Sequence, residues 1–217
     1  MELAAYTELI KLIPCEDQAF ETKRKTWEPY KNCVAFKEFY KHTFSNKDTV
    51  IFSRRDLFSF AETDAYKAIF AIILWGYPKG YTLGFNMPIL FPRLLNQVEF
   101  LLENLKSERF ITDEDFKLLI SNCDGIGLST LSKLLYFFKI EINKKKCLIM
   151  DSRIVRILRK DNFTELNSLS KVNEHNSINY YTDYLRVCTQ LSNEYGYKPD
   201  QLELFLFMFG NNLKQLL

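Results

Sequence analysis

The sequence predicts an all-α fold, and three observations support this prediction. Apolar residues recur with the helical period along most of the chain. Only 7 glycines and 6 prolines occur among 217 residues, which is too few for the many tight turns of a sandwich or barrel. Two short stretches, Thr49 to Phe52 and Cys147 to Met150, have strand-like composition, but their flanks favour extended connectors. At this length the chain forms one substantial core, or two small lobes that share an interface.

Helices are predicted where an apolar periodic stretch begins at a capping residue or ends at glycine or proline. From the N-terminus they are residues 1–12, Cys33 to Phe44, a segment starting at Thr63-Asp64 and ending at the stop signal Gly76 to Gly80, and Pro88 to Lys106, which Pro92 can break. There follow a helix capped at Thr112, Leu128 to Phe138, a helix capped at Asp151, Tyr180 to Tyr195 and Pro199 to Leu216. The polar region from Lys160 to Ser177 is predicted to be a surface loop.

Charge and cysteine usage exclude several classes of protein. The net charge is +2, so a nucleic-acid surface must come from local basic runs such as Lys23 to Lys25, Arg54-Arg55 and Lys144 to Lys146. Five cysteines without a C-x-x-C pair argue against a disulfide framework and a thiolate metal site. No signal peptide or membrane-length apolar run is present, so we expect a reducing, cytoplasmic setting. His42 and His175 lack ligand-spaced partners, and neither a metal nor a cofactor is expected.

The segment from Cys123 to Leu131 contains the most informative motif. Gly125 and Gly127 flank Ile126 between two helical patterns, which allows a sharp turn where side chains would clash. The turn leads into a helix N-terminus, where free N–H groups and the helix dipole favour a phosphate. Ile126 is expected to anchor the turn in the core. A plain tight turn needs the same residues, so the motif alone does not establish binding.

Gly125-Ile126-Gly127, the helix after it and Ile149 to Val155 together resemble the core of the helix-hairpin-helix DNA glycosylases, within which the chain looks closest to the bacterial 8-oxoguanine type. The resemblance is strong over residues 122–158, and we take 120–160 as the hairpin and catalytic segment of a single 1–217 unit. Elsewhere it is general, carried by Leu74 to Gly76 and Leu204 to Phe207. It implies a two-lobed helical fold and a monomer that excises a damaged base from double-stranded DNA.

The resemblance assigns the catalytic carboxylate to Asp151, although a plain helix N-cap also explains an aspartate there. Bifunctional members carry a lysine where this chain has Ser129, and serine cannot form a Schiff base. Lys133 lies one helical turn further on the same face, off the core stripe, and is the predicted nucleophile. If Lys133 is a solvated surface residue, the enzyme is monofunctional, with Asp151 assisting water, or is inactive.

DNA contacts are predicted at the hairpin and at a few cations. The hairpin set is Gly125, Ile126, Gly127 and Ser129, and the additional phosphate contacts are Arg153, Arg54 and Lys79. A flipped base needs flat apolar walls, for which the candidates are Trp75, Tyr77, Phe205 and Phe209, although aromatic residues at helical spacing are more often core. Trp75 and Phe209 are retained as the base pocket. Two alternatives stay open: a non-catalytic module that binds duplex DNA, and a glycosylase for another modified base.

Overall fold

The computed structural model describes the backbone of residues 1–82, 85–107, 109–123 and 125–213, and the side chains of these residues apart from 81–91 and 105–107. The protein is mostly helical with only short strands, so the all-α prediction is confirmed in outline. The first helices in the chain are α1 (Thr7–Lys11), α2 (Arg24–Trp27), α3 (Val34–Phe44), α4 (Arg54–Thr63), α5 (Ala65–Gly76), α6 (Met87–Asn96) and α7 (Val98–Ser107). They are followed by α8 (Asp113–Asn122), α9 (Leu128–Phe137), α10 (Ser152–Arg159), α11 (Ser177–Tyr195) and α12 (Pro199–Phe209).

Side-chain caps explain where several of these helices begin. Asp64 caps α5, and Thr112 caps α8 in a capping box with Asp115, as the sequence predicted. The chain between α6 and α7 breaks at Gln97 and not near Pro92, which lies inside α6. The change of direction at Gln97 lets both helices bury an apolar face, through Leu94 on α6 and Leu101 on α7.

The strands are short and form three small sheets. The longest pair is β1 (Ala19–Lys23) and β2 (Thr49–Ser53), which run antiparallel in a register from Ala19↔Ser53 to Lys23↔Thr49. The interpretation of Thr49 to Phe52 as a connector was therefore wrong, because its pairing partner lies 30 residues away in sequence and leaves no local signal. Cys147 to Met150 is an extended connector, as predicted. The remaining strands are β3 (Tyr81–Thr82) with β4 (Phe85–Asn86), and β5 (Phe110–Ile111) with β6 (Glu141–Ile142) and β7 (Lys145–Lys146).

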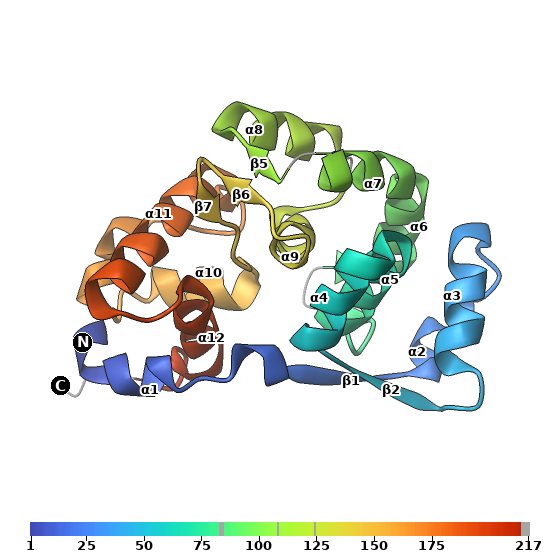
Figure 1. Cartoon of the computed structure of the whole chain (residues 1–217), viewed down its shortest axis with the longest axis horizontal. Coiled ribbons are helices and arrows are strands. Elements are labelled where there is room, and N and C mark those ends of the chain that lie inside the picture. Colours follow the sequence, from blue (N-terminus) through green and yellow to red (C-terminus); the bar gives the residue numbers. More distant parts are fainter. Residues whose placement is uncertain (83–84, 108, 124, 214–217) are drawn as a thin grey trace.

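Helix α9 lies in the middle of the molecule, with α10, α11 and α12 on one side and α4, α5, α6 and α7 on the other (Figure 1). The N-terminal α1 packs against α12, and α5 packs against α9. The region from Lys160 to Ser177 is not the simple surface loop that was predicted. It contains a 3-10 helix, Thr164–Leu169, and buries Phe163, Leu166 and Val172. Within the described residues, no helix is both long enough and apolar enough to cross a membrane.

Candidate active site between two helix N-termini

A tight turn joins α8 to α9 and exposes the N-terminus of α9. Gly125 has φ +71°, a conformation that side chains rarely adopt, and Ile126 is buried and donates its N–H to the carbonyl of Cys123 at 3.0 Å. Gly127 precedes α9 in extended conformation and offers no side-chain cap. Among the described residues no acceptor binds the N–H groups of Leu128 and Ser129, the first two of α9, which are thus available to an external acceptor. Ile126 anchors the turn as predicted.

Arg93, on α6, adds a cation to this turn. A Cβ placed on Gly125 would meet the Cδ of Arg93 at 2.6 Å, so the exposed arginine side chain lies directly over the glycine. Sequence reasoning missed Arg93 because only the fold brings α6 to the turn. The same arrangement explains why residue 125 has no side chain. A positive charge and free N–H groups together make a surface that attracts phosphate.

Lys133 is buried in the middle of α9, with only 3% of its surface exposed. Its Nζ donates to the carbonyl oxygen of Ser129 at 2.7 Å and to the Oγ of Ser129 at 3.0 Å, and it lies 5.3 Å from the ring centre of Tyr77. The alternative of a solvated lysine is therefore wrong. Gly76, the last residue of α5, leaves room for this side chain, since a Cβ there would meet the Cδ of Lys133 at 2.8 Å.

Asp151 caps the N-terminus of α10. Its Oδ1 accepts hydrogen bonds from the N–H groups of Arg153 at 2.9 Å and Ile154 at 3.0 Å. In the described part of the chain no hydrogen bond uses the second carboxylate oxygen, and the side chain is only half-buried. One oxygen thus fixes the orientation of the carboxylate, and the other remains available. Capping and catalysis are compatible here, because they use different atoms.

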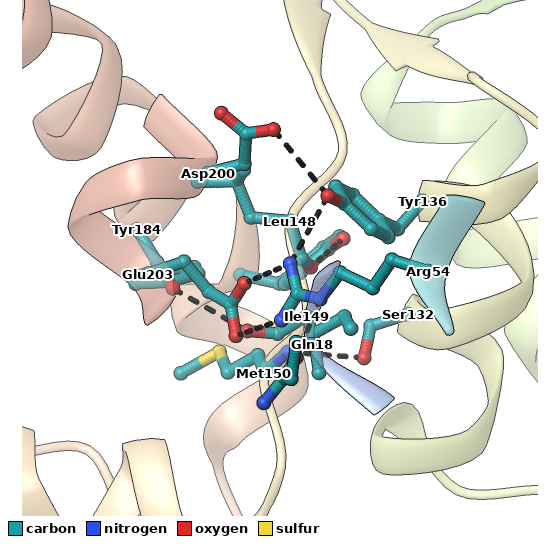
Figure 2. Close-up of polar contacts among 11 residues, drawn as sticks. Gln18, Arg54, Ser132, Tyr136, Leu148, Ile149, Met150, Tyr184, Asp200 and Glu203 are labelled. Carbon is teal, nitrogen blue, oxygen red and sulfur yellow. Dashed lines mark hydrogen bonds and ion pairs between the residues drawn. The ribbon is translucent and has the colours of Figure 1, made fainter. Parts of the chain in front are cut away.

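A buried extended segment leads into Asp151 and is bonded to α9, the helix that carries Lys133. The extended segment Cys147 to Met150 is held by a backbone bond from Cys147 N–H to the carbonyl of Ile140 at 3.0 Å and by side-chain bonds from its surroundings (Figure 2). The N–H of Met150 donates to Ser132 Oγ at 3.1 Å, Tyr181 donates to the carbonyl of Leu148 at 2.8 Å, and Tyr184 donates to the carbonyl of Ile149 at 3.3 Å. Ser132 precedes Lys133, and Met150 precedes Asp151. The two predicted catalytic residues are therefore neighbours of a directly bonded pair.

Arg54 was predicted to contact phosphate, and this prediction is wrong. Its side chain is 1% exposed, and its Nη1 lies 2.9 Å from an oxygen of Glu203 on α12. It also donates to Gln18 at 2.6 Å and to the hydroxyl of Tyr136 at 3.0 Å (Figure 2). Burial alone would lower the pKa of Arg54, but the Glu203 carboxylate and Tyr136 raise it above its usual value. Asp151 is one of the charges that, after burial, raise the pKa of Glu203, so this cluster lies within electrostatic reach of Asp151.

The predicted aromatic walls are mostly core residues. Trp75, Tyr77 and Phe205 are buried, whereas Phe209 is half-buried and packs on Phe205 at 5.7 Å. Phe20 and Phe207, which sequence reasoning did not single out, are half-buried with ring centres 6.3 Å apart.

Phe20 and Phe207 lie between Trp75 and Arg153 of α10. The ring of Phe20 lies 5.2 Å from that of Trp75, whose Nε1 is buried and has no hydrogen-bond partner among the described residues. The guanidinium group of Arg153 lies 4.5 Å from the ring centre of Phe207. Arg153 and Lys79 are both exposed, as a phosphate contact requires.

A family model described as "Putative 8-oxoguanine DNA glycosylase OGG-like protein" matches residues 13–207. The chain belongs to this OGG-like family. No curated protein and no solved structure matches it. The match contains the turn at Gly125, Lys133, Asp151 and the buried cluster around Arg54, and the family description implies DNA as the substrate.

In this OGG-like protein the described residues contain no group of three or more histidine, cysteine, aspartate or glutamate side chains arranged to hold a metal ion. His42 and His175 are exposed, as predicted. The cysteines are unpaired thiols, and burial raises the pKa of Cys123, beside the turn, to about 11.

Proposed function

We propose that this protein is a DNA glycosylase that removes an oxidised purine, with 8-oxoguanine as the first candidate, and that it also cleaves the abasic strand through a Schiff base on Lys133. The observation that carries the proposal is the buried Lys133 on a helix bonded, through Ser132 and Met150, to the segment that ends at Asp151. A module that only binds duplex DNA has no need for a buried lysine on a helix that is bonded to the segment ending at a half-free carboxylate. The helix-hairpin-helix role of residues 123–127 supplies the DNA contact in this scheme.

The contacts of Lys133 fit the role of an amine nucleophile. Once the ammonium group of Lys133 gives up one proton, two N–H bonds remain, and Ser129 provides two acceptors for them, its carbonyl oxygen and its Oγ. This arrangement leaves the nitrogen lone pair free to attack. The lone pair forms a bond to C1′ of the flipped nucleotide, while the glycosidic bond breaks and its electron pair leaves with the base, which takes up a proton. The amine then loses a proton, and its lone pair forms the C1′=N bond while the C1′–O4′ bond breaks and O4′ takes up a proton, which opens the sugar ring and gives the protonated imine.

The second oxygen of Asp151 stabilises the positive charge that develops on the sugar. Its Oδ1 is held by the N–H groups of α10, so the free oxygen keeps a fixed orientation during the reaction. Arg153, which follows on the same helix, is exposed and can contact the adjacent phosphate. Ser129, at the position of the family lysine, becomes a positioning residue for Lys133.

The flipped base binds near Phe20, Phe207 and Trp75. Half-buried rings provide a flat apolar surface, which is what a purine needs once it leaves the stack. The unpartnered N–H of Trp75 is costly when buried unless a ligand or water accepts its hydrogen bond, and the carbonyl oxygens of 8-oxoguanine are suitable acceptors. Trp75 is thus retained from the predicted pocket in a different role, as a donor. Phe207 takes precedence over Phe209 as a wall.

Borohydride reduction in the presence of a duplex containing 8-oxoguanine tests the nucleophile. Wild type and Ser129→Ala should both form a covalent protein–DNA adduct, whereas Lys133→Ala should not. Asp151→Asn should bind the duplex but excise base at least about a hundredfold more slowly. A duplex of the same sequence without the lesion is the control, and it should give no adduct.

Each alternative has its own outcome in this experiment. Excision without an adduct would mean a monofunctional enzyme in which water replaces Lys133. An adduct with another lesion, such as an alkylated base, and none with 8-oxoguanine would change the substrate. Duplex binding with no excision of any lesion would leave only the non-catalytic binding module.

A further inference from the structure

Helices α2 and α3 enclose a basic hollow that the proposed reaction does not use. It has a volume of about 250 Å³ and is lined by Arg24, Lys31, Lys37 and Lys41, together with Asn32, Tyr40, Phe44 and Ser45. No carboxylate of the described residues lines it. In Figure 1, α2 and α3 lie at the opposite end of the molecule from α10, α11 and α12. The hollow is therefore separate from the candidate active site.

The hollow has a rigid floor and a charged rim. Phe44 and Tyr40 are buried beneath it, and the hydroxyl of Tyr40 accepts a hydrogen bond from Arg24 Nε at 3.4 Å. Lys37 and Lys41 lie one turn apart on α3 and are exposed. Like charges at this spacing destabilise a helix unless an anion lies between them.

Nearby carboxylates offset only part of this charge. Glu28 forms an exposed ion pair with Lys31 at 3.0 Å, and Glu28 and Asp48 lie within electrostatic range of Arg24. Within the described residues, Lys37 and Lys41 form no ion pair. The hollow thus keeps a net positive charge, which attracts an anion.

The basic surface extends beyond the hollow. Lys41 and Ser45 also line a neighbouring groove of about 1040 Å³, to which His42, Lys47 and Lys67 contribute. The groove also contains Glu38 and Asp64, but Asp64 is occupied in capping α5. Several cations spread over the hollow and the groove fit a chain of phosphates better than a single small ion.

The geometry points to a second DNA-backbone site at Arg24, Lys31, Lys37 and Lys41, which binds a phosphodiester of the duplex away from the damaged base. The identity of the ligand as DNA rests on the proposed function. The site contributes to affinity and to the length of DNA covered, and it makes no contact with the reacting nucleotide. Such contacts position the protein without reading sequence.

Salt-dependent binding of an undamaged duplex tests this site. In Lys37→Gln/Lys41→Gln, the slope of log K against log salt should fall by about 0.9 for each phosphate that is no longer neutralised, and binding of a duplex of about 24 base pairs should weaken roughly tenfold or more. The matched control is Lys117→Gln/Lys171→Gln, which removes the same charge from exposed positions on α8 and after the 3-10 helix. The control should keep the wild-type slope.

Two further measurements separate a local site from a general charge effect. As the duplex is shortened stepwise from about 24 base pairs, the difference in affinity between wild type and Lys37→Gln/Lys41→Gln should disappear once it no longer spans from the turn at Gly125 to α3. Inorganic phosphate should raise the midpoint of thermal unfolding of wild type and of Lys37→Gln/Lys41→Gln equally, because the site binds a chain of phosphates and not a single ion. An unchanged slope, or an equal loss in the control variant, would overturn the proposal. Because the duplex is undamaged, this result is independent of whether any base is excised.

Discussion

Two cationic side chains, Arg54 and Lys133, are buried near the candidate active site, and their polar partners differ. Arg54 is 1% exposed and meets a carboxylate of Glu203 at 2.9 Å, with Tyr136 and Gln18 as further acceptors. Lys133 is 3% exposed, and its polar contacts are the two neutral oxygens of Ser129. In the part of the chain that the structure describes, no carboxylate lies within ion-pair distance of Lys133.

This difference separates a structural cation from a chemical one. Burying a charge costs free energy, and for Arg54 the Glu203 carboxylate offsets much of that cost. Lys133 gains no such compensation, so its burial does not serve stability. Natural proteins accept local destabilisation mainly at sites where it serves function. The comparison predicts that removing each cation will change different properties of the protein.

The largest effect is expected from Lys133→Met, which keeps an unbranched side chain and removes the amine. Excision with adduct formation should fall by at least about a hundredfold, because the nucleophile is lost. The free energy of unfolding should stay the same or rise by about 1 kcal/mol, since an uncompensated buried charge disappears. Single-turnover assays and urea denaturation measure the two quantities. A loss of stability of several kcal/mol would show that Lys133 is structural, like Arg54.

Breaking the buried pair should affect stability first. Glu203→Leu leaves Arg54 charged and unpaired, and should lower the free energy of unfolding by about 3–5 kcal/mol. Arg54→Met/Glu203→Leu removes both charges and should recover most of this loss. The exposed pair Arg186 and Asp183 is the control, and its disruption should cost about 1 kcal/mol or less. If the double variant is as unstable as the single one, the pair is not the source of the stability.

The features that the sequence predicted well are local ones. The turn at Gly125, the caps at Asp64 and Thr112, and the cap at Asp151 each depend on a few adjacent residues. Their physical causes are backbone conformation and free N–H groups, which act within one helical turn. Most of the predicted helices followed from the same signals, whereas α2 and α4 were not predicted.

The features that the sequence did not predict depend on distant partners. Arg54 and Glu203 are 149 residues apart, so nothing near Arg54 distinguishes a buried ion pair from a surface cation. Lys133 lies off the apolar stripe of its helix, yet Gly76 and Tyr77 cover it from α5. Phe20 lies in a strand and pairs with Phe52, 32 residues away, and its closeness to Phe207 appears only in the fold.

A smaller effect is expected from Ser132→Ala, which cuts the bond between the two catalytic segments. The N–H of Met150 loses its acceptor in a buried position, which should cost about 1–3 kcal/mol of stability. Because Asp151 follows Met150, the excision rate should also fall, roughly tenfold, with little change in duplex affinity. Ser121→Ala, on the exposed face of α8, removes a hydroxyl that bonds only within its own helix and is the matched control. A rate equal to wild type would mean that Asp151 is held by its own cap alone.

The smallest effect, and the most specific to Lys133, is expected from Gly76→Ala. The added Cβ would lie 2.8 Å from Cδ and 3.1 Å from Cε of the lysine, so the side chain must shift. Alanine gains helix propensity of up to about 1 kcal/mol, which offsets part of this strain and keeps the net change in stability small. In a Lys133→Ala background the strain is absent, and the same substitution should stabilise the protein; the difference between the two backgrounds is the coupling between residues 76 and 133. Borohydride trapping by Gly76→Ala should be severalfold slower than by wild type, because the amine no longer rests on Ser129. Trapping at the wild-type rate, despite measurable coupling, would mean that the lysine leaves this resting position before it reacts. Ser129 would then bind the amine at rest but would not orient it for the attack.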